Sequence, residues 1–419
     1  MTSTQTPGAT TADGSARRAV PLYVMGGALS LFGNSAIGIV LPWLVISTTG
    51  DLSTTALVAT VAGLAAVPAS LLGGRLADRL GARRVAVAAD VGSALSVASL
   101  ALVDAWLGLG VGWFIVLGVA GALFDVPGMT ARQALMADVA RVGGVKVDAV
   151  AGAFQAAFSL AFLAGPALTG VLLGVLDPID VVWVTAACSA GAAVLTWCVP
   201  VENPGHDAFG SASGGGWGII RRDPRLRATL VIAFTATFVT PPLLSVVLPG
   251  HFAALGQPEA FGSTVSAFAV GTLAGSVLFA VLTRRSRLLA YVTGIVAMTA
   301  GMVTMAGLGG VALMAVGMAV MGLGSGLYGP VWNVFVAEQV PTEVRARVLS
   351  VINALALVAG PLGLGALTLV LSVADLRTGA LCIAVVWLLV GLFALVSRHA
   401  RDVARPPVVQ QDGAHADDR

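Results

Sequence analysis

Long runs of apolar residues, separated by short charged segments, dominate this chain. Windows without Asp, Glu, Lys or Arg occupy residues 19–50, 52–74, 105–124, 149–176, 181–201, 228–258, 260–283, 288–337, 348–374 and 378–397. A helix needs about 20 apolar residues to cross the hydrocarbon core of a bilayer. Each window therefore predicts at least one membrane-spanning helix.

Two segments change this count. As a single helix, residues 288–337 would be about 75 Å long at 1.5 Å per residue, so we expect the segment to fold back at the turn-forming run 307–310, Gly-Leu-Gly-Gly. Residues 85–103 form a further apolar segment that is interrupted only by Asp90. The pattern thus predicts an all-α integral membrane protein with twelve transmembrane helices.

The basic residues orient these helices. If both termini are cytoplasmic, 22 of the 23 Lys and Arg residues fall in inner segments, and Arg377 alone lies in an outer loop. Basic residues concentrate on the cytoplasmic side of membrane proteins, so we expect both ends of the chain to be cytoplasmic. Residues 1–16 lack the order of basic and then apolar residues that marks a signal peptide. The expected location is the cell membrane, with a bacterial source suggested by 22 arginines against one lysine.

The chain divides into two similar halves. A Gly- and Ser-rich polar break at 202–227 follows the sixth predicted span. The fifth span carries Ala164-Gly165-Pro166 and the eleventh carries Ala359-Gly360-Pro361. We therefore predict two parallel six-helix repeats with a site between them. The expected segments are a tail at 1–19, a bundle at 20–201, a central loop at 202–227, a bundle at 228–398 and a tail at 399–419.

Composition excludes several classes of protein. Apolar residues make up 57% of the chain and charged residues 11%, against about 25% charged residues in soluble proteins. This excludes an ordinary soluble enzyme, a disordered protein and a nucleic-acid-binding protein, and the net charge of +2 is small. The three cysteines form no C-x-x-C pair, which predicts neither a disulfide framework nor a metal site. No ATP-binding G-x-x-x-x-G-K-[ST] motif is present, and we expect no cofactor. The sequence also lacks the clustered acidic residues that an integral-membrane enzyme needs, which argues against that class.

The loop between spans two and three carries a recognisable motif. Residues 74–84 read G-R-L-A-D-R-L-G-A-R-R. This loop resembles the signature of the major facilitator superfamily, with Ala82 in place of a basic residue. The residues that carry the resemblance are Gly74, Asp78, Arg79, Gly81, Arg83 and Arg84. In that family the loop acts as an inner gate latch, which implies that Asp78 accepts hydrogen bonds from the N-terminus of a facing helix in the other half. The alternative is a basic cytoplasmic turn without a switching role.

A second motif lies in span five. Gly152, Gly165, Pro166 and Gly170 resemble the antiporter motif of drug- and macrolide-exporting members of the superfamily, with Ala161 and Thr169 replacing two of its glycines. Small residues four apart allow helices to pack closely, and proline bends a helix. The resemblance implies a bent, tightly packed helix that seals the seam between the halves. The alternative is an ordinary small-residue packing face.

Two acids lie within predicted spans, Asp90 and Asp125. Charged groups in a bilayer are costly and often functional, so both are candidates for carrying protons. Both also lie within about six residues of the cytoplasmic end of their spans, or about 9 Å at 1.5 Å per residue. They are therefore also candidates for structural ion pairs with Arg83, Arg84 or Arg132.

The remaining polar and aromatic side chains in the spans suggest a substrate cavity. The candidates are Asn34, Gln155, Phe158, Tyr328, Trp332, Asn333 and Asn353. Each could instead contact lipid or a neighbouring helix. An apolar cavity with a few amides suits a hydrophobic or amphipathic small molecule.

We therefore expect a secondary exporter of such molecules that works by alternating access and is driven by proton antiport. We expect it to act as a monomer in the lipid bilayer. The alternatives are an importer or exporter of a narrow metabolite, or a non-transporting membrane sensor on the same fold.

Overall fold

A computed structural model describes residues 9–201, 216–340 and 342–404, and within these ranges all the regular structure is helical. The first group of helices comprises α1 (Ala9–Thr49), α2 (Leu52–Leu80), α3 (Ala82–Leu107), α4 (Val111–Val142), α5 (Val147–Val175) and α6 (Pro178–Trp197). The second comprises α8 (Pro224–Pro242), η1 (Leu243–Val247), α9 (Leu248–Leu255), α10 (Pro258–Leu282), α11 (Arg287–Ala306), α12 (Val311–Gln339), α13 (Thr342–Leu371) and α14 (Leu376–Val396). Two short helices, α7 (Gly216–Arg222) and α15 (Arg398–Asp402), accompany the second group.

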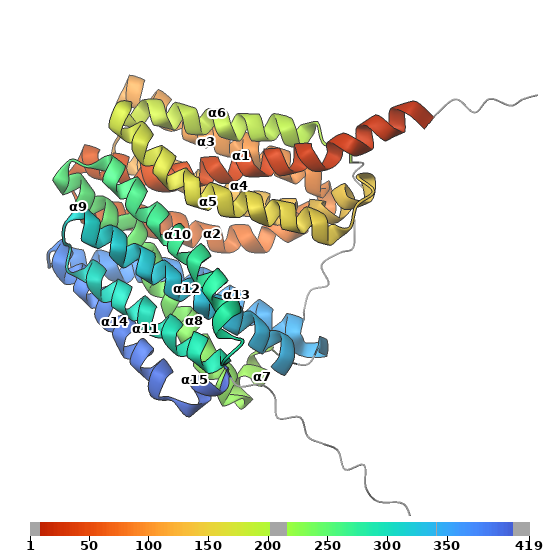
Figure 1. The fold of residues 1–419 in the computed structure, drawn as a ribbon. Helices are drawn as coiled ribbons and strands as arrows, with labels where there is room; N and C mark the ends of the chain where they lie inside the picture. Colours follow the sequence, from red (N-terminus) through yellow and green to blue (C-terminus); the bar gives the residue numbers. More distant parts are fainter. Residues whose placement is uncertain (1–8, 202–215, 341, 405–419) are drawn as a thin grey trace, which may run out of the picture.

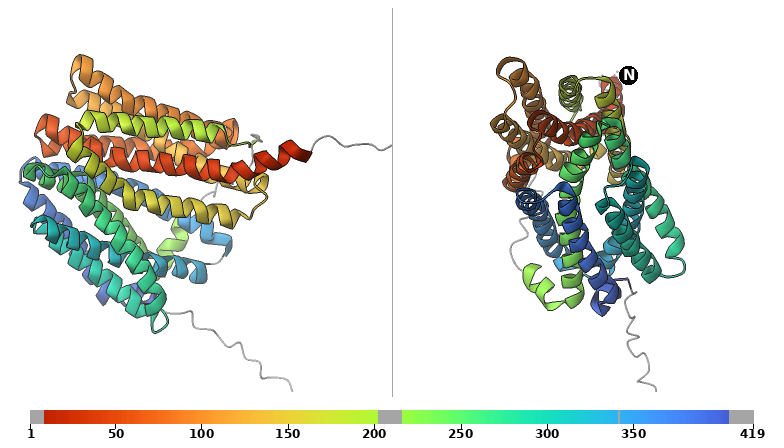
Figure 2. Two further views of the ribbon diagram at one scale, coloured as in Figure 1. Left: turned by 45° about the horizontal axis from the view of Figure 1, so that its top comes forward. Right: turned by 90° about the vertical axis from the view of Figure 1, so that its left-hand side faces the viewer.

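Twelve segments of the described chain are long and apolar enough to cross a membrane, which confirms the predicted number of spans. The two groups lie side by side (Figure 1). We call the end of the bundle where α1 begins the proximal end, and the end where α1 stops at Thr49 the distal end. The groups converge at the distal end and diverge toward the proximal end (Figures 1 and 2).

Tight turns at glycine fix several helix boundaries. Gly81 has a φ of +88° and joins α2 to α3, a left-handed conformation that glycine adopts at little cost. The expected turn at 307–310 separates α11 from α12, and Leu308 there has a φ of +46°. Asp51 begins α2 by accepting hydrogen bonds from the main-chain N–H groups of Ser53 and Thr54, which are otherwise unpaired at a helix N-terminus.

The two groups touch through small residues. A Cβ at Gly170 of α5 would lie 2.8 Å from the Cα of Gly262 in α10. A Cβ at Gly63 of α2 would lie 2.9 Å from Cγ of Pro361 in α13. Close backbone approach is how helices associate tightly in lipid. These two crossings hold the halves together in the distal part of the molecule.

Three features differ from the sequence-based expectation. Helix α1 begins at Ala9, within the segment that we expected to be a tail, and α7 forms within the expected central loop. The seventh span is one apolar window, but the structure divides it into α8, the π-helical turn η1 and α9. Pro241 and Pro242 precede this turn. Proline has no N–H to donate, so the regular hydrogen-bond pattern breaks there and a wider turn follows.

Candidate functional site

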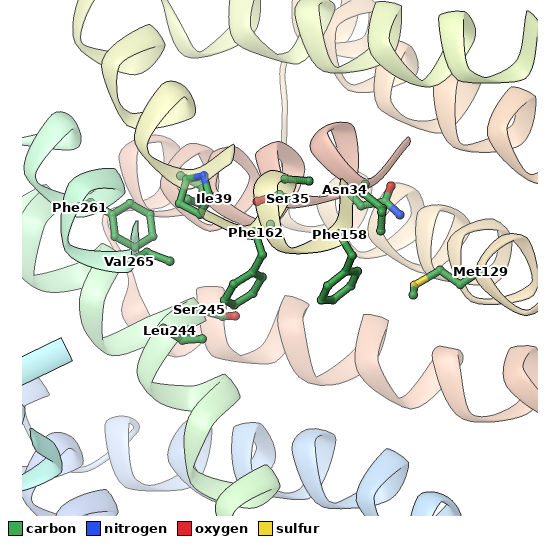
Figure 3. A pocket seen from close by; sticks show the side chains of 14 residues that line it. Asn34, Ser35, Ile39, Met129, Phe158, Phe162, Leu244, Ser245, Phe261 and Val265 are labelled. Atoms are coloured by element: carbon green, nitrogen blue, oxygen red, sulfur yellow. The ribbon is translucent and has the colours of Figure 1, made fainter. Parts of the chain in front are cut away.

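A cavity of about 310 Å³ lies between the two groups of helices. Residues of α1, α4, α5, η1 and α10 form its walls (Figure 3). We call it the interface cavity. Its lining residues are Leu31, Asn34, Ser35, Gly38, Ile39, Met129, Phe158, Ala161, Phe162, Pro166, Leu244, Ser245, Phe261 and Val265.

The walls are mainly apolar and aromatic. Phe158 and Phe162 are stacked with their ring centres 6.3 Å apart, and Figure 3 shows them side by side on one helix. Phe162 also meets Phe268 of α10 edge to face at 6.2 Å, so an aromatic contact bridges the seam between α5 and α10. Asn34, Ser35 and Ser245 supply polar groups. Apolar walls with a few polar groups are typical of sites for small organic molecules.

The predicted cavity residues divide between two environments. Asn34 and Phe158 line the interface cavity. Gln155 and Asn353 are exposed and do not line it.

The candidates on α12 do not line the interface cavity either. The Tyr328 hydroxyl is buried without a hydrogen-bond partner among the described residues. Trp332 packs against Phe335, with ring centres 6.0 Å apart. The side chain of Asn333 lies outside the described residues.

Sequence reasoning missed several residues of this site, most clearly Ser245. Its position follows from the π-helical turn, which brings Leu244 and Ser245 into the cavity wall. The available signal was the adjacent pair Pro241-Pro242 inside an apolar window, because two prolines disturb the main-chain hydrogen bonds of a helix.

The span-five motif lies where three helices meet. A Cβ at Gly165 would come within 2.6 Å of the Ser35 hydroxyl on α1, whereas Gly170 packs against α10. Pro166 lines the interface cavity. Gly152, nearer the proximal end, has open space around it. The motif therefore includes both packing glycines and one glycine without a neighbour.

The loop motif lies at the proximal end, where the halves diverge. Asp78 is half-buried and makes no hydrogen bond or ion pair in the described part of the chain. The side chains of residues 342–347, at the start of α13, are outside the described set. Gly74 is half-buried, and Arg79 and Arg84 are exposed.

Arg83 binds within its own half. Its guanidinium donates hydrogen bonds to the main-chain oxygens of Val199 and Val201, at 2.8 and 3.0 Å. It also lies 5.5 Å from the ring centre of Trp197. These hydrogen bonds join the start of α3 to the segment that follows α6, whose last helical residue is Trp197.

Asp90 belongs to a buried network. It forms an ion pair with Arg132 of α4 and accepts a hydrogen bond of 2.9 Å from the Ser30 hydroxyl on α1. Arg132 also donates to the Thr196 hydroxyl on α6 at 3.1 Å. The Tyr23 hydroxyl donates to the main-chain oxygen of Arg132 at 3.0 Å. Of the two roles considered for Asp90, the structure shows the ion pair.

Asp125 has a different environment. It is half-buried against Ser93 and within electrostatic range of Asp90, and no ion pair joins it to a basic side chain in the described ranges. It lines a second cavity of about 230 Å³. The expected ion pair between Asp125 and an arginine is therefore not found among the described residues. A group of three or more side chains that could bind a metal ion is also not found in this part of the chain.

Comparison with known proteins identifies the class. The Major Facilitator Superfamily model matches residues 23–256 and 242–417, so this chain belongs to that superfamily of membrane transporters and is not an enzyme. It is 30% identical to the multidrug efflux pump Tap of Mycolicibacterium fortuitum over 399 residues, covering 92% of this chain and 98% of that protein. It is 25% identical to macrolide efflux protein A of Enterococcus faecalis over 307 residues, covering 70% of this chain and 93% of that protein.

Solved structures support the fold. The nucleoside transporter NupG superposes with a TM-score of 0.73 at 14% identity and covers 90% of this chain and 98% of its own. A bacterial homologue of the lysosomal transporter Spinster gives a TM-score of 0.69 at 13% identity, with 96% and 100% covered. The chain is thus a multi-pass membrane transporter with multidrug efflux pumps among its relatives.

Proposed function

We propose that the protein is a secondary exporter of hydrophobic or amphipathic small molecules that works by alternating access. The observation that carries this proposal is the interface cavity, which has aromatic walls, a few polar groups and helices of both halves around it. Such a cavity suits a mainly apolar organic molecule better than an ion or a free sugar. The efflux relatives support export as the direction.

The shape of the bundle supports alternating access. Contacts between the halves lie at the distal crossings of α5 with α10 and of α2 with α13, and the helices diverge at the proximal end (Figure 2). With both termini cytoplasmic, as the basic residues predict, this arrangement is open to the cytoplasm. Closure there would bring Asp78 toward α13, as the latch hypothesis requires.

Protons are the proposed coupling ion, and Asp125 is the group proposed to carry them. It lines a cavity and has no basic partner among the described residues, so it can gain or lose a proton without breaking an ion pair. Asp90 is held by Arg132 and serves a structural role in this proposal. The transporting unit is proposed to be a single chain, because one chain contains the whole cavity.

Uptake of a neutral lipophilic fluorescent dye into inside-out membrane vesicles tests this function. An acidic lumen should drive dye accumulation, and Asp125→Asn should remove the part that depends on the pH gradient. Asp138→Asn is the matched control on the same helix, since Asp138 pairs with the exposed Arg141 at 2.7 Å. Accumulation that is equal with and without the gradient would contradict proton coupling. No accumulation in either condition would contradict export of apolar compounds.

A further inference from the structure

Exposed arginines gather at the proximal end of the second group of helices. Helices α7 and α15 both contact α8 there, and both lie at this end of the bundle (Figure 1). The Tyr291 hydroxyl donates a hydrogen bond of 3.3 Å to the main-chain oxygen of Ala394, which joins the start of α11 to the end of α14, next to α15. We use the name basic rim for six exposed side chains of α7, α8, the α10–α11 turn and α15. They are Arg221, Arg222, Arg227, Arg284, Arg285 and Arg398.

The charges of the basic rim are not compensated by acids. None of its six arginines makes an ion pair or a hydrogen bond within the described part of the chain. Asp223 and Asp402, the acids of the same segments, are half-buried, and Asp223 accepts a hydrogen bond of 2.8 Å from the main-chain N–H of Arg225. In the first group, by contrast, Arg141 pairs with Asp138. The basic rim is therefore a surface with one sign of charge.

Exposed apolar side chains follow the basic rim on each spanning helix that carries it or adjoins it. They lie two to four residues from the arginines, toward the middle of α8, α10, α11 and α14. These residues are Val231, Val281, Leu289 and Val396, and 43–66% of each is exposed. Exposed apolar faces of spanning helices contact hydrocarbon, and basic residues beside them lie at the level of the lipid head groups.

Helix α7 adds an amphipathic element to this surface. Ile220 is 1% exposed and belongs to the hydrophobic core, and α7 also contacts α13, so the helix is fixed to the body of the second group. Trp217 on the same helix is 51% exposed. Tryptophan concentrates at the membrane–water interface, and guanidinium groups bind phosphate oxygens through two parallel hydrogen bonds. Helix α7 thus presents both kinds of side chain that recognise a phospholipid head group.

We propose that the basic rim binds the head groups of anionic phospholipids, with Arg221 and Arg222 of α7 as the principal contacts and Trp217 beside them in the interface. A cluster of four to eight basic residues next to membrane-spanning helices is typical of sites for anionic lipids. Phosphatidylcholine has no net charge and would leave the arginines uncompensated, whereas each phosphatidylglycerol supplies one negative charge. The partner is thus an anionic phospholipid, whichever molecule the protein transports.

Fluorescence quenching at α7 tests this interaction. Gly218 is exposed, and a Cβ there would meet nothing within 4 Å, so Gly218→Cys can carry a small fluorophore. The labelled full-length protein, with Cys188, Cys198 and Cys382 replaced, is placed in lipid nanodiscs with equal amounts of phosphatidylglycerol and phosphatidylcholine. A nitroxide quencher is attached to the acyl chain of one lipid or of the other. Quenching by the anionic lipid should be stronger by about fivefold, the factor for one basic side chain at an anionic surface.

Charge variants should change this ratio of quenching. Arg221→Gln together with Arg222→Gln should bring the ratio close to one, and the corresponding pair of lysine substitutions should keep most of it because the charge remains. The control is Arg141→Gln together with Lys146→Gln, which removes two exposed charges from the first group and should leave the ratio unchanged. Raising the salt from 0.1 to 1 M shortens the Debye length from about 10 to about 3 Å and should lower the ratio without any substitution.

Several results would overturn the proposal. A ratio near one before any arginine is replaced would do so, as would weak quenching by both lipids, because α7 would then not lie among anionic head groups. A ratio that survives in the glutamine variant, or that falls equally in the control, would mean that α7 is not the site of contact. If the glutamine variant does not fold, the lysine variant and the salt dependence still decide the question. No substrate is present, so the result is independent of the proposed export.

Discussion

At the scale of single residues, the ion pair between Asp90 and Arg132 has the clearest consequence for stability. Both side chains are nearly fully buried, with 6% of the Asp90 side chain and 2% of the Arg132 side chain exposed. Removing one member of a buried pair leaves an uncompensated charge and typically costs about 3–5 kcal/mol. We expect Asp90→Asn or Arg132→Met alone to lower the free energy of unfolding by about this amount. Equilibrium unfolding in detergent measures the change.

The double variant is the decisive control for this pair. Replacing both Asp90 and Arg132 removes both charges, so its loss should be smaller than the sum of the two single losses. Arg141→Ala breaks the exposed pair with Asp138 and should cost no more than about 1 kcal/mol. Strictly additive losses in the double variant would show that Asp90 and Arg132 do not act as a pair.

Asp51 provides a residue whose contribution depends on pH. It lies between α1 and α2, and the hydroxyls of Thr54 and Ser53, followed by their main-chain N–H groups, stabilise its carboxylate and lower the pKa of Asp51. Because the pKa of Asp51 is lower in the folded protein than in the unfolded chain, its carboxylate stabilises the fold fully when the pH is above the ordinary aspartate pKa. This stabilisation is lost as the pH falls through the pKa of Asp51 in the folded protein. Asp51→Ala should therefore cost about 1 kcal/mol at neutral pH, and less as the pH falls below about 4.

Thermal unfolding in detergent as a function of pH measures this effect. Asn also caps helices, so Asp51→Asn should keep most of the stability and lose the acid dependence that Asp51 contributes. A stability difference between the wild type and Asp51→Ala that stays constant down to pH 3 would show that the carboxylate charge is not what stabilises α2.

At the scale of elements, α5 contains two glycines with opposite expected responses to alanine. A Cβ at Gly170 would lie 3.0 Å from the main-chain nitrogen of Gly262, so Gly170→Ala should push α5 and α10 apart and cost about 1–3 kcal/mol. Gly152 has nothing within 4 Å, and Gly152→Ala should stabilise the helix by about 0.5–1 kcal/mol. The melting temperatures of the two variants should move in opposite directions. A rise in the melting temperature of Gly170→Ala would contradict the assignment of Gly170 to a helix crossing, and a fall for Gly152→Ala would contradict the open space at Gly152.

At the scale of the whole molecule, the sequence predicted the number of spans because each crossing requires a long uncharged window and each loop carries charges. Hydropathy does not tell which face of a helix meets another helix, since lipid and a helix neighbour are both apolar. For this reason the sequence placed Asp90 near three possible arginines, and only the fold selected Arg132. The role of Ser245 could not be predicted, because a π-helical turn rotates it into the cavity.

The proposed transport cycle makes a prediction about the crossing of α2 and α13. A Cβ at Gly365 would lie 3.5 Å from Cγ2 of Thr60, so cysteines at these two positions would face each other across the crossing. Thr60→Cys with Gly365→Cys, in a background with Cys188, Cys198 and Cys382 replaced, should form a disulfide on mild oxidation. If the halves must separate at this crossing in every cycle, oxidation should abolish transport, and a reductant should restore it.

Each single-cysteine protein should be insensitive to the same oxidant, because one cysteine at this crossing has no partner. Mass spectrometry of the oxidised double variant establishes that the bond has formed before transport is measured. Full transport by the cross-linked protein would mean that the distal crossing stays closed throughout the cycle. The outward opening would then have to arise elsewhere, with the seam between α5 and α10 as the next candidate, since Gly170 and Gly262 hold it closed in this structure.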